Sequence, residues 1–159
     1  MHIKVLMVGK IKERYLLDGV SEYLKRLSPY ARMDLVSVPD EPIPEGASAA
    51  QEEQVKAKEA EKILKQLDPG QYVIALDMRG KLISSEDLAE FLAERALRGQ
   101  SNLAFVIGGS LGLSAELLQR ADARLSLGRL TFLHQMVPLV LLEQIYRGYK
   151  INRGETYHK

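Results

Sequence analysis

The chain has 159 residues, 46% of them hydrophobic and 27% charged, which is typical of one globular domain spanning residues 1–159. It contains no cysteine, which excludes disulfides, thiolate metal sites and a cysteine nucleophile. The formal net charge of +1 argues against a non-specific nucleic-acid binder, because such proteins are usually more basic.

The amino-terminal segment favours a protein that stays inside the cell. Residues 1–9 contain an apolar stretch too short for a secretory signal and no cleavage site. No apolar run in the chain is long enough to span a bilayer. We therefore expect a cytoplasmic protein with no membrane partner.

The first half of the chain alternates between predicted strands and helices. In chain order, the patterns predict a strand at Ile3–Val8, a helix at Lys12–Leu27, a strand at Met33–Val38 and a helix at Gln51–Leu67. A long proline-rich loop precedes the second helix, and Asp68-Pro69-Gly70 marks the turn that ends it.

The second half continues the alternation. It predicts strands at Tyr72–Leu76, Leu103–Ile107 and Ala123–Leu127, with helices at 85–98, 115–120 and 135–149. Most strand runs are continuously apolar, as in strands buried on both faces of a parallel sheet. The order predicts an α/β fold with a mostly parallel sheet flanked by helices.

The strand at 103–107 runs into a glycine-rich turn that begins at Gly108. Glycines allow a ligand to approach the backbone closely, and ligands of open α/β sheets bind beyond the carboxyl ends of the strands. The spacing matches neither the dinucleotide nor the triphosphate pattern. A ligand site and a plain tight turn both remain open here.

Two other strand ends carry polar residues. Asp77, Arg79 and Lys81 follow the strand at 72–76, and taken alone they favour a solvated turn. His134 follows the last strand, and a capping or structural role is favoured over acid–base chemistry.

The last fourteen residues, 146–159, interleave basic and aromatic side chains. Arginine and lysine can hold phosphates while tyrosine stacks on a base, so the tail is a candidate for RNA contact. Fraying of a terminal segment is an equal alternative. The three histidines have no zinc-ligand spacing, so no metal site is predicted.

Seven stretches, in this order, closely resemble the SPOUT-class methyltransferases that modify N3 of pseudouridine in large-subunit ribosomal RNA. The resemblance covers essentially the whole chain. The stretches are Val8–Lys10, Glu22–Leu27, Val38–Glu41, Phe105–Ser110, Thr131-Phe132 with His134–Met136, Glu143–Arg147 and Tyr157–Lys159.

The resemblance implies a deep trefoil knot in the C-terminal part of the α/β fold. It also implies a homodimer with the methyl-donor pocket close to the subunit interface. By the family pattern, S-adenosylmethionine would be bound by Leu76, Gly108, Leu127, Gly128, Arg129, Leu130, Thr131 and Phe132. These residues lie at or after the three predicted strand ends that were discussed above as places for a ligand.

The same resemblance implies a substrate side formed by Arg147, Tyr157, His158 and Lys159. Our hypothesis is that His158 or a water takes the N3 proton, and that Arg147 and Lys159 contact RNA. The RNA would be that of an assembled ribosome, where shape can supplement charge.

Two alternatives stay open at this point. One is a SPOUT enzyme that acts on transfer RNA. The other is a non-catalytic ribosome- or RNA-binding homologue, suggested by departures from the family pattern. Leu133 stands where a proline is usual, Pro138 where an arginine is usual, and Leu111 where a polar residue is common.

Overall fold

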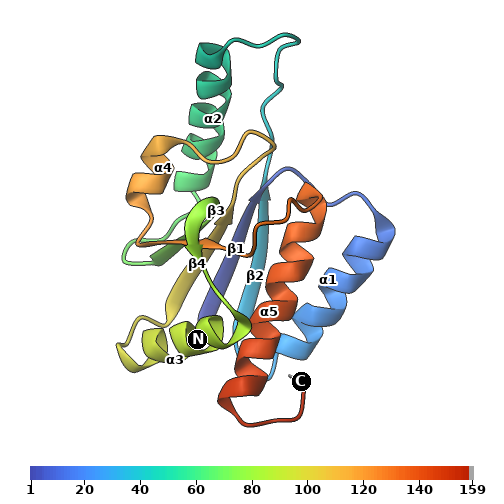
Figure 1. Ribbon diagram of the computed structural model, residues 1–159, viewed down its shortest axis with the longest axis vertical. Coiled ribbons are helices and arrows are strands. Elements are labelled where there is room, and N and C mark those ends of the chain that lie inside the picture. The colour runs from blue at the N-terminus through green and yellow to red at the C-terminus, as the bar shows by residue number, and fades with distance from the viewer. Residues whose placement is uncertain (158–159) are drawn as a thin grey trace.

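Five strands form one parallel sheet in the order β2-β1-β4-β3-β5 in the computed structural model, which describes residues 1–157 (Figure 1). The strands are β1 (His2–Val8), β2 (Arg32–Val38), β3 (Tyr72–Leu82), β4 (Asn102–Ile107) and β5 (Ala123–Ser126). Every pairing between neighbours is parallel. The predicted α/β fold with a mostly parallel sheet is therefore confirmed.

Helices cover both faces of the sheet. They are α1 (Arg14–Leu27), α2 (Ala49–Leu64), α3 (Ser85–Leu97), α4 (Ala115–Arg120) and α5 (Val137–Asn152), with a short 3₁₀ helix, η1 (His134–Met136), before α5. Helices α1, α3 and α5 share one apolar cluster with the sheet, while α2 and α4 share the other. Figure 1 shows α1 and α5 lying side by side.

The side chains of β1 show why both faces of the sheet need a layer of helices. Ile3, Val5 and Met7 belong to the cluster under α1, α3 and α5, whereas Leu6 and Val8 belong to the cluster under α2 and α4. All five side chains are at most 1% exposed. A strand that is apolar on both sides is stable only between two layers of helices.

Serine caps set three of the helix starts. Ser48 and Ser84 each accept a hydrogen bond from the backbone of the third helical residue and complete a capping box, and Ser114 caps α4. The capping box at Ser48 starts α2 two residues earlier than predicted. Helix α5 begins at Val137 with Pro138 in its first turn, where the missing N–H costs little.

Strand β3 is longer than predicted, and the expectation that it ends at Leu76 is wrong. Leu76 and Lys81 both pair with Leu125 of β5, so residues 77–80 leave the ladder and the strand then resumes. Gly80 makes the return possible, because a Cβ at this position would lie 2.7 Å from the carbonyl carbon of Arg124. The segment 77–80 is named the β3 excursion below.

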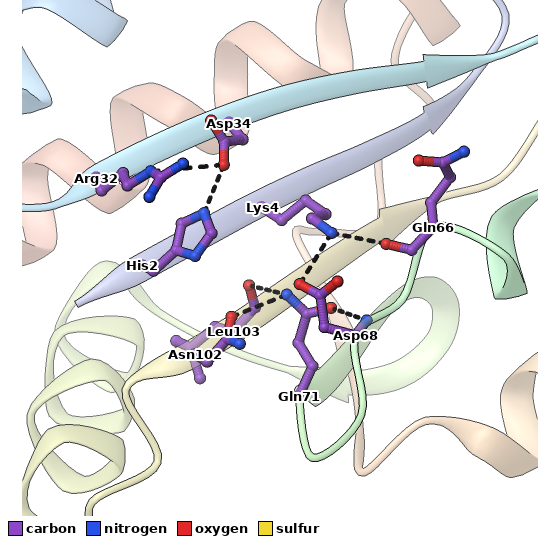
Figure 2. A network of polar contacts seen from close by, with 9 residues as sticks. All are labelled: His2, Lys4, Arg32, Asp34, Gln66, Asp68, Gln71, Asn102 and Leu103. Atoms are coloured by element: carbon purple, nitrogen blue, oxygen red, sulfur yellow. Dashed lines mark hydrogen bonds and ion pairs between the residues drawn. The ribbon is translucent and has the colours of Figure 1, made fainter.

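Polar side chains tie the amino ends of the strands together (Figure 2). His2 of β1 lies 2.5 Å from the Asp34 carboxylate of β2. Lys4 donates to the backbone oxygen of Gln66 and to Asp68, in the turn before β3. The cavity described below lies at the opposite edge of the sheet, toward the carboxyl ends of the strands.

No helix within residues 1–157 is long and apolar enough to cross a membrane. The trefoil knot that the resemblance implies stays a prediction.

Candidate active site

A cavity of about 540 Å³ lies where β3 leaves its ladder after Leu76, beside the carboxyl ends of β4 and β5. Its walls are the β3 excursion, the glycine-rich turn after β4, the loop after β5, and the start of the last helical segment. Leu76 of β3, Gly108 after β4 and Leu130 after β5 line this one space.

The structure brings together seven of the eight residues expected to bind the donor. These are Leu76, Gly108, Leu127, Gly128, Leu130, Thr131 and Phe132. Arg129 is not among the residues that line the cavity. Binding of a donor by these residues stays a prediction, but the position of the cavity is the one typical of ligand sites in open α/β sheets.

Gly108 is required by the packing of the turn itself. A Cβ at this position would lie 2.9 Å from the carbonyl carbon and oxygen of Gly112. Gly112 has a φ of 86° and donates its N–H to the oxygen of Gly109 over 3.0 Å. The turn is therefore folded back on itself, with its main-chain groups beside the cavity.

A buried serine holds the loop after β5. Ser126 is 4% exposed, and its hydroxyl donates to the oxygen of Gly128 over 3.0 Å and accepts the N–H of the same residue over 3.4 Å. Sequence reasoning missed Ser126. A serine two residues before a loop glycine was the available signal, because short hydroxyl side chains often hydrogen-bond nearby backbone.

His134 anchors the far end of this loop. Its Nε2 lies 2.7 Å from the carbonyl oxygen of Val8, at the end of β1. The next residue, Gln135, accepts the backbone N–H of Lys12 through Oε1 over 2.7 Å. Both contacts fix the loop to the β1–α1 connection and favour the structural role for His134.

A smaller polar cavity of about 180 Å³ adjoins the first and shares Gly109, Ser110, Leu111 and His134 with it. Its buried charge is Glu59 of α2, which is 5% exposed and accepts the backbone N–H of Glu41 over 3.0 Å. Burial raises the pKa of the Glu59 carboxyl above its ordinary value.

Arg147 and Tyr157 form a second cluster with Glu143 and Tyr23. The Arg147 Nε donates to Glu143 over 3.1 Å, and its guanidinium lies 4.8 Å from the centre of the Tyr157 ring. The Tyr157 hydroxyl donates to the same carboxylate over 3.1 Å and lies 3.1 Å from the hydroxyl of Tyr23. Burial, followed by the hydrogen bond with Tyr23, raises the pKa of Tyr157, so the phenol is protonated at neutral pH and acts as a donor.

The structure does not bring this cluster to the cavity. Neither Arg147 nor Tyr157 lines the cavity, which reaches α5 only at Val137. Ten residues of helix separate Val137 from Arg147, a rise of about 15 Å. His158 and Lys159, the other predicted substrate-side residues, lie outside the described part of the chain.

Glu143 was not assigned a role from the sequence. It holds both Arg147 and Tyr157, and the signal for it was present in its spacing, because a glutamate four residues before an arginine faces it on a helix. Within residues 1–157 no cluster of three or more histidine, aspartate or glutamate side chains could hold a metal ion.

Comparison with known proteins decides the family. The family model described as "Predicted SPOUT methyltransferase" matches residues 1–158. The chain belongs to the SPOUT methyltransferase family. It is therefore an enzyme that transfers a methyl group and uses a methyl donor, as the resemblance predicted.

Relatives of this SPOUT methyltransferase extend over its full length. It is 67% identical over 161 residues to a protein of Symbiobacterium thermophilum, and 58% identical over 159 residues to one of Carboxydothermus hydrogenoformans. A protein of Enterococcus faecalis is 52% identical over 159 residues. All three are named "Ribosomal RNA large subunit methyltransferase H", and each match covers 100% of both chains.

Among solved structures, the SPOUT methyltransferase resembles a methylase family protein from Neisseria gonorrhoeae. The two share 15% sequence identity with a TM-score of 0.52, over 99% of this chain and 86% of the other. At this identity the likeness bears on the fold alone.

Proposed function

We propose that the protein transfers the methyl group of S-adenosylmethionine to N3 of a pseudouridine in large-subunit ribosomal RNA. The observation that carries the proposal is the convergence of Leu76, Gly108 and Leu130 on one cavity. The target class follows from the full-length relatives, which are named as large-subunit ribosomal RNA methyltransferases.

The cavity suits the adenosine part of such a donor. Its walls combine apolar side chains, among them Leu127 and Phe132, with main-chain groups of the glycine-rich turn and the loop after β5. Main-chain donors and acceptors can hydrogen-bond an adenine edge while the apolar side chains cover its faces. The donor supplies the methyl group and its own leaving group, so the protein mainly positions the two reactants.

The N3 proton must leave before or during the transfer. The raised pKa of Tyr157 makes its phenol a poor proton acceptor, so we assign it to hydrogen-bond donation. His158 or a water remains our assignment for the base. Arg147, held by Glu143, would stabilise the N3 anion or contact RNA together with Lys159.

A second copy of the chain completes the site in this proposal. Arg147 and Tyr157 lie away from the cavity of their own chain, so a partner must present its own cluster to the cavity. A two-fold symmetric homodimer would then contain two identical composite sites. An enzyme acting on ribosomes would work in the cytoplasm.

Methylation assays with labelled donor test the proposal directly. Purified large ribosomal subunits, assembled ribosomes and transfer RNA would each be incubated with the protein, and the product nucleoside identified by mass spectrometry. We expect label in N3-methylpseudouridine of the ribosomal samples only. Label in transfer RNA would favour the alternative enzyme, and no donor binding at millimolar concentration would favour the non-catalytic homologue.

A further inference from the structure

The β3 excursion places Asp77 at the wall of the cavity. Leu76, Asp77, Met78 and Arg79 all line the space, because residues 77–80 leave the β3–β5 ladder at this edge. The excursion returns through Gly80, whose close approach to the backbone of β5 fixes its base. Asp77 is therefore held at the cavity wall by the sheet.

The orientation of Asp77 is set within the excursion. Its Oδ1 accepts the backbone N–H of Arg79 over 3.3 Å. No other residue of the described chain, 1–157, forms a hydrogen bond or ion pair with this carboxylate. The side chain is half-buried, so its charge is only partly screened by water.

Asp77 is the single carboxylate among the cavity-lining residues of the described chain. The other ionisable side chains on the walls are Arg79, which is exposed, and His134, whose Nε2 is engaged by Val8. Most remaining lining groups are apolar side chains or main-chain atoms. Asp77 thus places a carboxylate that has no ion-pair partner in the described chain on the wall of a mostly apolar space.

We infer that Asp77 recognises the positive sulfonium of the methyl donor and discriminates it from the neutral thioether product. This inference rests on the proposed function. In the transfer, N3 forms a bond to the methyl carbon, the carbon–sulfur bond breaks, and its electron pair stays on sulfur. The sulfur charge falls from +1 to zero, so the attraction to Asp77 ends when the product forms.

The assignment makes Asp77 a binding residue that favours donor entry and product release. Attraction to the sulfonium is present before the transfer and weakens during it, so Asp77 does not lower the barrier of the chemical step. The substitution Asp77→Asn should therefore raise the KM for the donor without lowering kcat.

Calorimetry with three ligands tests the inference on the full-length protein. S-adenosylmethionine and sinefungin carry a positive charge at the position of the transferred methyl group, and S-adenosylhomocysteine does not. Asp77→Asn should weaken binding of the two cationic ligands about fivefold, equivalent to roughly 1 kcal/mol, and leave the neutral product within about twofold. Asp77→Glu should retain the discrimination. Asp18→Asn, which removes an exposed carboxylate of α1, is the matched control and should change none of the three.

Equal weakening of all three ligands by Asp77→Asn would overturn the inference, because it would place Asp77 against a part of the donor common to them. No change in any of the three would overturn it as well. If the wild-type protein binds none of them, the proposed function fails and the inference fails with it. A salt titration of the wild type needs no variant: the affinity ratio of S-adenosylmethionine to S-adenosylhomocysteine should fall as salt rises, and a constant ratio would contradict the role of charge.

Discussion

Gly108 is needed both for the close packing of the glycine-rich turn and for the shape of the cavity that the turn lines. An alanine here would place a methyl group 2.9 Å from backbone atoms of Gly112, which cannot move without opening the turn. We expect Gly108→Ala to lower the free energy of unfolding by about 1–3 kcal/mol and to weaken donor binding. Denaturant unfolding and calorimetry measure the two effects.

The control for this variant is Gly46→Ala. Gly46 also lies in the chain's irregular segments but has no atom within 4 Å of a built Cβ, so only its φ of 64° opposes the change. It should cost stability without affecting donor binding. Normal donor affinity in Gly108→Ala would mean that the turn is not part of the donor site, which would contradict the role we propose for Gly108.

The buried Glu59 side chain should make the free energy of unfolding depend on pH. Burial raises its pKa in the folded protein above the ordinary value of 4.5, so the folded state binds this proton more tightly than the unfolded state. Ionisation of Glu59 therefore reduces stability as pH rises through the folded pKa. Glu59→Gln removes the titration and should gain stability relative to wild type as the pH rises from the ordinary carboxyl pKa of 4.5 toward neutrality.

The measurement is denaturant unfolding of both proteins across that range. Because carboxyl groups far from Glu59 titrate alike in the two proteins, the difference between them reports Glu59 together with its interaction with Asp40 and Glu41. A difference that stays constant with pH would show that the Glu59 pKa is not raised by folding.

At the scale of elements, the serine caps fix where helices begin. Ser84 caps α3 by accepting the N–H of Asp87, whose carboxylate accepts the N–H of Ser84 in return. Ser84→Ala should cost about 1 kcal/mol of unfolding free energy, as for other helix caps. Ser21→Ala, on the exposed face of α1, is the control and should have little effect. Equal stability of the two variants would contradict the capping role.

The elements also show what sequence could and could not establish. The helical segments and the strands buried on both faces depend on local residue types and spacing, and these were predicted. The β3 excursion was not, because the return of Lys81 to the ladder depends on the close approach of Gly80 to Arg124, far along the chain. Asp77 was accordingly interpreted as part of a solvated turn.

At the scale of the whole molecule, the position of Arg147 and Tyr157 was beyond sequence reasoning. The family resemblance assigned them to the substrate side, but the distance between that cluster and the cavity depends on how α5 crosses the sheet (Figure 1). That separation is the reason for proposing that the homodimer implied by the resemblance contains composite sites.

Mixing two inactive variants tests the composite site. Arg147→Ala removes the substrate-side cation, and Gly108→Ala impairs the donor cavity, so neither homodimer should methylate RNA. After subunit exchange, mixed dimers would contain one intact composite site, restoring about a quarter of the activity for random pairing. No recovery in dimers shown to have exchanged would place both parts of the site within one chain.

Our central proposal is that the β3 excursion and the carboxyl ends of β4 and β5 form the methyl-donor site. A crystal structure of the full-length protein with S-adenosylhomocysteine measures this directly. We predict adenosine enclosed between Leu76, Gly108 and Leu130, with hydrogen bonds to main-chain groups of the loop after β5. Adenosine bound at any other surface, with this cavity free of ligand at saturating concentration, would contradict the account.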